Sequence, residues 1–132
     1  MTEERDLPTP AEIIEIHEEI EESYGLDHTG ISTQLPEQTL ERILTDVDRH
    51  DSVYLRAAAL LRDLISAHIF EDGNKRTAWT VTRLYLENHE TIPAVRDPDR
   101  VAHVLRRIQR FDYRELADWL AAGDIDEDRL SP

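Results

Sequence analysis

A short run of chemically active side chains lies between positions 68 and 76 of this 132-residue chain, in the segment HIFEDGNKR. The imidazole side chain of a histidine can act as a base near neutral pH, so His68 can take a proton from an incoming hydroxyl group. The cationic Lys75 and Arg76 follow Asp72 after two residues. A carboxylate beside bound phosphates is repulsive unless a cation lies between them, so Asp72 fits a Mg²⁺ ligand shared with phosphate oxygens. This pattern predicts chemistry on a phosphate-bearing substrate.

The backbone of the same segment is predicted to bind anions. Gly73 allows the chain to approach a phosphate closely, and the helix that follows offers unpaired N–H groups and the positive end of its dipole. Lys75 is the only lysine in a chain with 15 basic residues, which indicates a role that arginine cannot fill. Phe70 is predicted to pin the loop to the core. The structural alternatives are a core position for His68 and a helix N-cap for Asp72.

The apolar residues around this segment recur at helical spacing, and no alternating run is long enough for a sheet. The expected helices span residues 9–24, 37–50, 52–68, 75–89, 97–110 and 113–122. Thr9 and Glu12 form one expected capping box, and Asp112 and Glu115 form another. The predicted fold class is therefore all-α, a single compact bundle of about six helices with the active segment between two central ones. One domain is expected over residues 1–132, with residues 1–8 and 123–132 frayed.

Composition limits the function classes. The net charge of -14 and the absence of a basic stripe argue against direct nucleic-acid binding. No apolar run is long enough to span a membrane, and the acidic start MTEERDLPTP does not resemble a signal peptide. The chain has no cysteine, as is common in a reducing cytoplasm, so we expect a cytoplasmic protein. The excess of 29 Asp and Glu over 15 Lys and Arg is typical of a halophile, where salt screens carboxylate repulsion.

The string HIFEDGNKRTA resembles the Fic/Doc signature H-x-F-x-[DE]-[AG]-N-[GK]-R at every defined position. The segment TPAEIIEIHEEIEESYG also resembles the first helix of death-on-curing (Doc) toxins, so the resemblance extends over residues 8–122. It implies that His68 is the general base acting on a target hydroxyl. It further implies that Asp72 binds Mg²⁺ together with the nucleotide. The residues implied to cradle the phosphates are Gly73, Asn74, Lys75 and Arg76. By the same resemblance, residues 26–36 are the candidate flap that docks a target segment.

Two positions favour the Doc branch of this family. Adenylylating Fic proteins typically have a second glycine where this chain has Lys75, and a further arginine where it has Trp79. The Doc resemblance implies a toxin of a toxin–antitoxin pair, transferring the γ-phosphoryl of ATP to a threonine or serine hydroxyl of a protein target. The implied target is translation elongation factor Tu or its archaeal equivalent. The alternative is a Fic-type adenylyltransferase, which carries out AMPylation with the same ATP and Mg²⁺.

Other interpretations concern regulation and different chemistry. The inhibitory motif [ST]-x-x-x-E-[GN] of some Fic proteins has no full match, since the nearest string begins at Thr33, ends on Gln38 and contains Pro36. Restraint by a separate antitoxin is therefore expected, through a disordered segment that folds onto this domain. The dipeptide His50-Asp51 raises the rival hypothesis of an HD-type metal phosphohydrolase. A non-catalytic helical binding module is the third alternative. The histidines at positions 17, 28, 89 and 103 show no ligand spacing and are interpreted as surface or core residues.

Overall fold

A computed structural model of the chain describes residues 7–25, 30–31 and 35–131. Within these residues the chain forms six α-helices and two short 3₁₀ helices, with no β-strand apart from one isolated bridge. The helices are α1 (Pro10–Tyr24), α2 (Pro36–Asp48), α3 (Val53–Ala67), α4 (Asn74–Asn88), α5 (Pro98–Leu105), η1 (Ile108–Arg110), α6 (Tyr113–Ala122) and η2 (Glu127–Leu130). The all-α prediction is confirmed.

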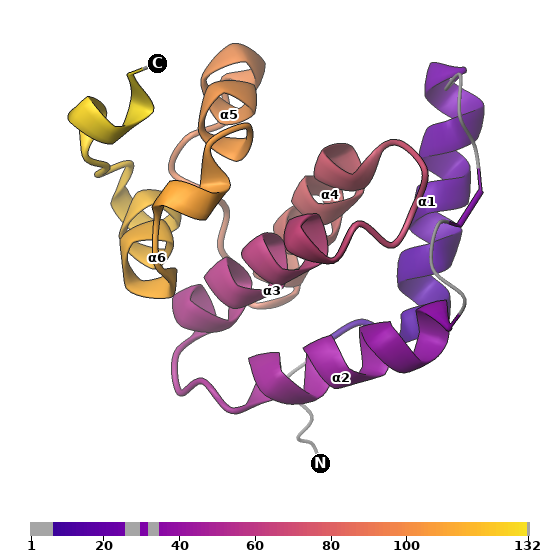
Figure 1. The fold of residues 1–132 in the computed structure, drawn as a ribbon. Coiled ribbons are helices and arrows are strands. Elements are labelled where there is room, and N and C mark those ends of the chain that lie inside the picture. Colours follow the sequence, from indigo (N-terminus) through magenta and orange to yellow (C-terminus); the bar gives the residue numbers. More distant parts are fainter. Residues whose placement is uncertain (1–6, 26–29, 32–34, 132) are drawn as a thin grey trace.

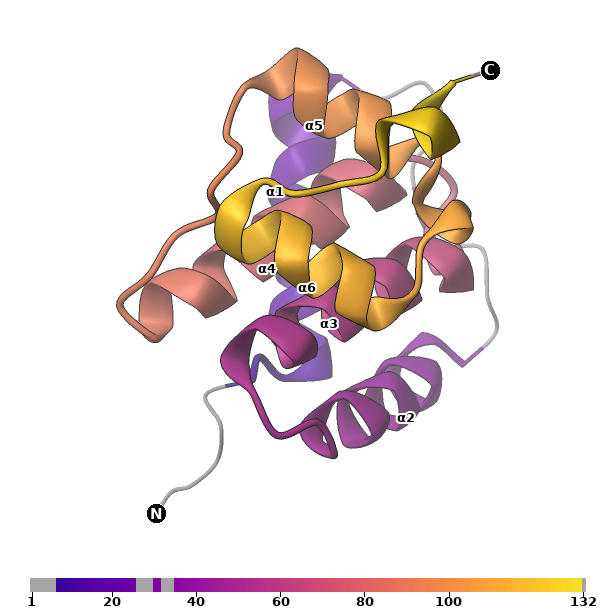
Figure 2. The ribbon, with the colours of Figure 1, turned by 90° about the vertical axis from the view of Figure 1, so that its left-hand side faces the viewer.

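Helix α3 lies at the centre of the bundle, between α2 on one side and α6 on the other (Figures 1 and 2). Helix α4 packs along α3, and α1 packs against the outer side of α4 and one end of α2. Eight of the 15 residues of α3 are buried, as expected of the most apolar helix in the sequence. Its neighbour α4 begins where the loop from α3 reaches α1, so three helices meet at the segment that carries the signature.

The helix ends follow from local chemistry that the sequence displays. Thr9 caps α1 by accepting a hydrogen bond from the Glu12 N–H at 3.2 Å, and the Glu12 carboxylate accepts from the Thr9 N–H at 2.8 Å. Gly25 ends the same helix in the left-handed conformation, where glycine meets no Cβ penalty. Asp112 and Glu115 form the same reciprocal pair at the start of α6. Both predicted capping boxes are therefore confirmed.

The predicted helix over residues 97–110 is interrupted. α5 ends at Leu105, and the chain tightens into the 3₁₀ turn η1 before α6 begins. Arg62 on α3 holds this turn, since its Nε donates to the backbone oxygen of Phe111 at 2.9 Å. The turn brings the side chains of Ile108 and Phe111 into the core, where both are almost fully buried. A continuous helix would leave the phenylalanine without this packing.

The expectation that residues 123–132 are frayed is wrong as far as Ser131. Leu130 is only 2% exposed and belongs to the hydrophobic core. Arg129 binds the Glu115 carboxylate, with Nη1 3.0 Å from Oε1, and donates to the backbone oxygen of Arg110. These contacts dock η2 against α6 and η1. At the other end Leu7 packs against the core, while residues 1–6 and 132 lie outside the described residues.

Replacing Leu130 is expected to destabilise the whole domain. Leu130→Ala should lower the free energy of unfolding by about 2–4 kcal/mol, the usual cost of a cavity at a buried leucine. Urea denaturation followed by circular dichroism measures this cost. The matched control is Leu35→Ala, because the Leu35 side chain is 57% exposed. Equal, small effects of the two substitutions would show that the tail is not docked in solution.

The described helices also bear on membrane association. None of them combines the length and the apolar character that crossing a bilayer requires.

Candidate active site

The signature loop is a sharp turn between α3 and α4. His68 follows the last residue of α3 and adopts a left-handed backbone conformation, with φ 48° and ψ 52°. Among the described residues, only His68 and Glu90 adopt a positive φ without being glycine. Such a conformation costs a non-glycine residue of the order of 1–2 kcal/mol, and positions of this kind cluster at functional sites. The strained turn places His68 in the lining of a cleft.

Helix α4 begins without a side-chain cap. Gly73 occupies the N-cap position with φ 78°, and it has no side chain to accept from the first amides. Side chains cap the starts of α1, α3, α5 and α6, while α2, like α4, begins without a side-chain cap. Free N–H groups at a helix start, together with the positive end of its dipole, bind anions. The backbone N–H groups in the first turn of α4 can therefore bind a ligand anion in place of a capping side chain.

Phe70 and Asn74 fix the loop from inside. Phe70 is 4% exposed, which places it in the core as an anchor of the loop. The Asn74 side chain accepts from the Phe70 N–H at 3.1 Å and donates to the Phe70 backbone oxygen at 2.9 Å. Both ends of the amide are thereby engaged within the loop. A phosphate contact of Asn74 can therefore use its backbone N–H or the second hydrogen of Nδ2, and not Oδ1.

Asp72 is an exposed residue in the wall of the cleft, directly before Gly73. Its Oδ1 accepts from the Gly73 N–H at 2.8 Å, and it does not cap α4, since Gly73 is the N-cap residue. Among the described residues no group of three or more His, Cys, Asp or Glu side chains is suited to hold a metal ion. Mg²⁺ is commonly bound by one or two carboxylates together with substrate phosphates. A single accessible carboxylate beside an anion site fits that mode of binding.

The cleft next to the loop has a volume of about 860 Å³ and lies between the loop, α4 and α5. Its basic residues are Lys75, Arg76, Arg83, Arg96 and Arg106, and its acidic residues are Glu71 and Asp72. The lining thus carries a formal excess of three positive charges, although the chain as a whole carries a net charge of -14. This local reversal of sign matches a ligand with several negative charges.

Arg76 and Tyr24 form one wall of this cleft. The Arg76 guanidinium lies over the ring of Tyr24, with Cζ 4.1 Å from the ring centroid. Stacking holds the plane of a guanidinium, while its N–H groups lie at the edge, where they bind phosphate oxygens in a fixed geometry. Tyr24 is 60% exposed, so its ring does not belong to the core and its contact with Arg76 lies at the surface. Sequence reasoning had not connected Tyr24 with the site.

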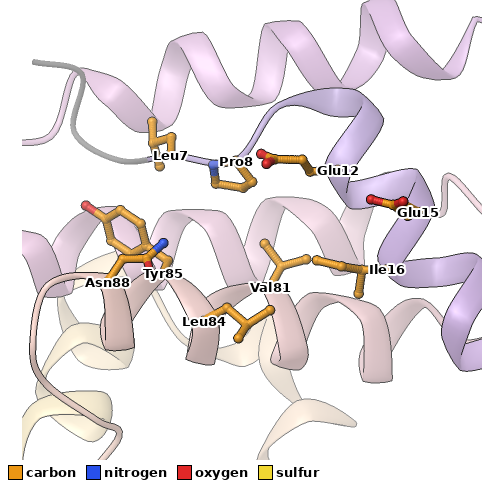
Figure 3. Close-up of a pocket in the computed structure, with 9 residues that line it drawn as sticks. All are labelled: Leu7, Pro8, Glu12, Glu15, Ile16, Val81, Leu84, Tyr85 and Asn88. Atoms are coloured by element: carbon orange, nitrogen blue, oxygen red, sulfur yellow. The ribbon is translucent and has the colours of Figure 1, made fainter. Parts of the chain in front are cut away.

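A second hollow lies between α1 and α4, and its character is different (Figure 3). Glu12, Glu15 and Ile16 project into it from α1, opposite Val81 and Leu84 of α4. Two carboxylates and no basic residue line this groove. A polyphosphate would be repelled there, so the cleft at the signature loop is the candidate nucleotide site.

His17 was not predicted to take part in the site. Its side chain is 2% exposed, and its ring stacks on Phe70 with centroids 3.7 Å apart and an angle of 6° between the planes. Its Nε2 lies 2.7 Å from the backbone oxygen of Asp72. A signal was present in the sequence, because His17 lies between Ile13 and Ile20 on the buried face of α1.

The structure gives little support to an HD-type metal site at His50 and Asp51. The ring of His50 packs edge-on against Tyr113, with centroids 5.3 Å apart. Its backbone oxygen accepts from the buried Arg56 at 2.7 Å. Neither residue belongs to a potential metal-binding group within the described part of the chain.

The signature segment thus lies at the turn into a helix without a side-chain cap, beside a cationic cleft, in an all-α bundle. A sequence model of the Fic/DOC family matches residues 7–86, which is more than half of the chain. The chain therefore belongs to the Fic/DOC family.

The chain is also similar to one curated protein. It shares 36% identity over 84 residues with Toxin Doc of Mycolicibacterium smegmatis (strain ATCC 700084 / mc(2)155). The aligned region covers 58% of this chain and 65% of that toxin. The match thus spans slightly less than two thirds of the length of the relative.

Proposed function

We propose that the chain is a Doc-like toxin that transfers the γ-phosphoryl group of ATP to a threonine or serine hydroxyl of a protein target. The observation that carries this proposal is the uncapped start of α4, which opens beside His68 into a cleft whose lining is cationic in an acidic protein. A nucleoside triphosphate supplies the negative charge that this cleft lacks. Similarity to a protein named Toxin Doc supports the toxin role.

In the proposed reaction His68 accepts the proton of the target hydroxyl as its oxygen attacks the γ-phosphorus. The bond between that phosphorus and the β,γ-bridging oxygen breaks, and ADP leaves. Lys75, Arg76 and the first N–H groups of α4 stabilise the negative charge on the phosphates. Mg²⁺ held by Asp72 and phosphate oxygens would neutralise further charge. The stacked position of Arg76 on Tyr24 keeps its guanidinium oriented in the cleft wall.

The choice of the γ-phosphorus rests on Lys75 and Trp79. Both residues line the cleft, and Trp79 packs against Trp119 with ring centroids 5.8 Å apart. An aromatic ring at position 79 offers no positive charge where adenylylating relatives have an arginine, so the triphosphate would be held differently. The alternative is adenylyl transfer, in which the hydroxyl attacks the α-phosphorus and pyrophosphate leaves.

Intact-mass spectrometry of the organism's elongation factor tests this proposal directly. The factor is incubated with this protein, ATP and Mg²⁺ at high salt. A gain the size of a phosphoryl group is expected, and its absence when His68→Ala replaces the wild type ties it to this site. A gain the size of an adenylyl group would instead establish AMPylation. Nucleotide binding without modification of any target would favour the non-catalytic binding module.

Lys75→Gly is expected to slow phosphoryl transfer by about 10- to 100-fold. Loss of one hydrogen bond to a charged group costs roughly 1.5–3 kcal/mol, and 1.4 kcal/mol corresponds to a factor of ten. The substitution also restores the glycine of adenylylating relatives, so some adenylylated product is expected in the same mass spectrum. Lys75→Arg is the control that keeps the charge. If Lys75→Gly behaves as the wild type does, the main argument for a kinase is lost.

We further propose that a separate antitoxin restrains this activity. The chain contains no full match to the inhibitory motif of self-restrained relatives, and Pro36 of the nearest string is the first residue of α2.

Residues 26–29 and 32–34 of the candidate target-docking flap lie outside the described residues. The backbone oxygen of Gly30 accepts a hydrogen bond from the Glu71 N–H at 3.1 Å, so this residue lies beside the signature loop.

A further inference from the structure

His17 joins α1 to the signature loop through two contacts of different kinds. Its ring covers one face of the Phe70 ring, and its Nε2 lies 2.7 Å from the backbone oxygen of Asp72. The two partners lie on either side of Glu71 in the loop. The His17 side chain thus contacts both Phe70, which anchors the loop, and the backbone of Asp72.

The hydrogen bond to Asp72 determines that Nε2 of the His17 ring carries a hydrogen. A backbone carbonyl only accepts hydrogen bonds, so Nε2 of His17 must carry the hydrogen and donate it. The side chain is 2% exposed, so water has little access to replace the bond. A buried donor or acceptor left without its partner is costly. The Asp72 carbonyl is therefore strongly held in its orientation toward α1.

The other side of His17 connects to the segment between α1 and α2. Nδ1 lies 3.8 Å from Glu21 Oε2, which accepts from the Gly30 N–H at 2.6 Å. The Gly30 backbone oxygen in turn accepts from the Glu71 N–H, and Ile31 forms an isolated antiparallel bridge with Phe70. These contacts connect α1, Gly30 and the signature loop in one network. Within this network, His17 is the residue that contacts Asp72.

We infer that His17 is a positioning residue for Asp72. By fixing the Asp72 carbonyl, it sets the peptide plane between Asp72 and Gly73, and with it the direction of the carboxylate and of the first N–H groups of α4. It touches neither nucleotide nor target hydroxyl in this role. The inference rests on the proposed function of the cleft, and it assigns to α1 a part in metal and phosphate binding that the signature residues do not include.

Two substitutions separate the hydrogen bond from the packing. His17→Phe keeps an aromatic ring against Phe70 but has no donor for the Asp72 carbonyl. His17→Gln loses the stacked ring but places an amide N–H near the position of Nε2. His103→Phe is the control for a general histidine-to-phenylalanine effect, since His103 lies on α5 and does not line the cleft.

The first readout is amide hydrogen exchange, which requires neither nucleotide nor activity. In His17→Phe the hydrogen-bonded amides of Phe70, Glu71 and Gly73 are expected to exchange at least about tenfold faster, while those of the α3 core keep the wild-type rate. His17→Gln should restore most of the protection. Unchanged exchange in His17→Phe overturns the inference, and so does equal acceleration throughout α3 and the loop, because that pattern reports general destabilisation.

The second readout is the Mg²⁺ concentration that gives half-maximal ATP binding. Residues that orient a metal ligand typically contribute 10- to 100-fold to metal affinity, so His17→Phe should raise this concentration by about tenfold. His17→Gln should stay close to the wild type. A purely structural role would move the midpoint only as far as the loss of folded protein requires, and circular dichroism measures that loss independently. A shift fully explained by the folded fraction overturns the inference. If the wild type itself binds no ATP, the proposed function fails. The exchange experiment still tests whether His17 holds the backbone of Asp72.

Discussion

His68→Ala is expected to reduce transfer to the target protein by about 10²- to 10⁴-fold, the range that a positioned general base contributes. Alanine cannot accept the hydroxyl proton, so the attacking oxygen would remain a poor nucleophile. ATP binding should change little, because the anion site consists of the α4 start and the basic residues of the cleft. Intact-mass spectrometry measures the transfer, and isothermal titration calorimetry with Mg²⁺ and ATP measures the binding.

The left-handed backbone of His68 requires a second variant. Alanine at φ 48° is strained, whereas asparagine tolerates this region well. His68→Asn should therefore preserve the turn but lose the proton acceptor, and it should be as inactive as His68→Ala. His103→Ala is the control for a histidine outside the cleft. Substantial transfer by His68→Asn would rule out the general-base role, and loss of ATP binding in both variants would assign His68 to the turn alone.

Much of the fold could be predicted because its signals are local. A Thr or Asp followed three residues later by Glu determines the starts of α1 and α6 by direct hydrogen bonds. The apolar residues of α3 recur at helical spacing, and that helix is the centre of the core. The candidate site was predicted for the same reason, since its signature residues are contiguous from His68 to Arg76.

The features that were missed depend on contacts between distant residues. His17 and Asp72 are 55 positions apart, and no spacing rule connects a histidine on α1 with a carbonyl in the loop. Arg129 lies in a polar tail that resembles a solvated segment, yet its bonds to Glu115 and the backbone of Arg110 dock that tail. In both cases a polar side chain is satisfied by a partner from another element. Composition alone does not distinguish such a residue from one that faces water.

The cleft shows the same limitation in its charges. Arg83, Arg96 and Arg106 lie outside the signature, on α4, before α5 and after it, and the fold brings them to one cleft with Lys75 and Arg76. In the sequence they are dispersed among 29 acidic residues, so no basic cluster is visible. A cationic cleft in an acidic protein focuses positive potential on one site and attracts anionic substrates. High salt would weaken this attraction by screening.

Asp72→Ala is expected to lower transfer by at least about 100-fold and to flatten its dependence on Mg²⁺ concentration. Without the carboxylate, the ion would be held by the nucleotide alone, and the phosphates would lose a fixed position beside His68. The measurement is initial transfer rate against Mg²⁺ concentration at saturating ATP. Binding of ATP without Mg²⁺ should be retained or improved, because a negative charge is removed from the anion site.

Two further variants separate charge from backbone support. Asp72→Asn keeps an oxygen that can accept from the Gly73 N–H but removes the negative charge, so it should lose activity almost as fully as Asp72→Ala. Glu71→Gln is the matched control, because Glu71 is the other exposed carboxylate of the cleft and the signature does not define its position. If Asp72→Asn keeps the wild-type Mg²⁺ profile, the Asp72 side chain serves the turn and not the metal. If Glu71→Gln shifts the profile instead, the metal ligand is the neighbouring residue.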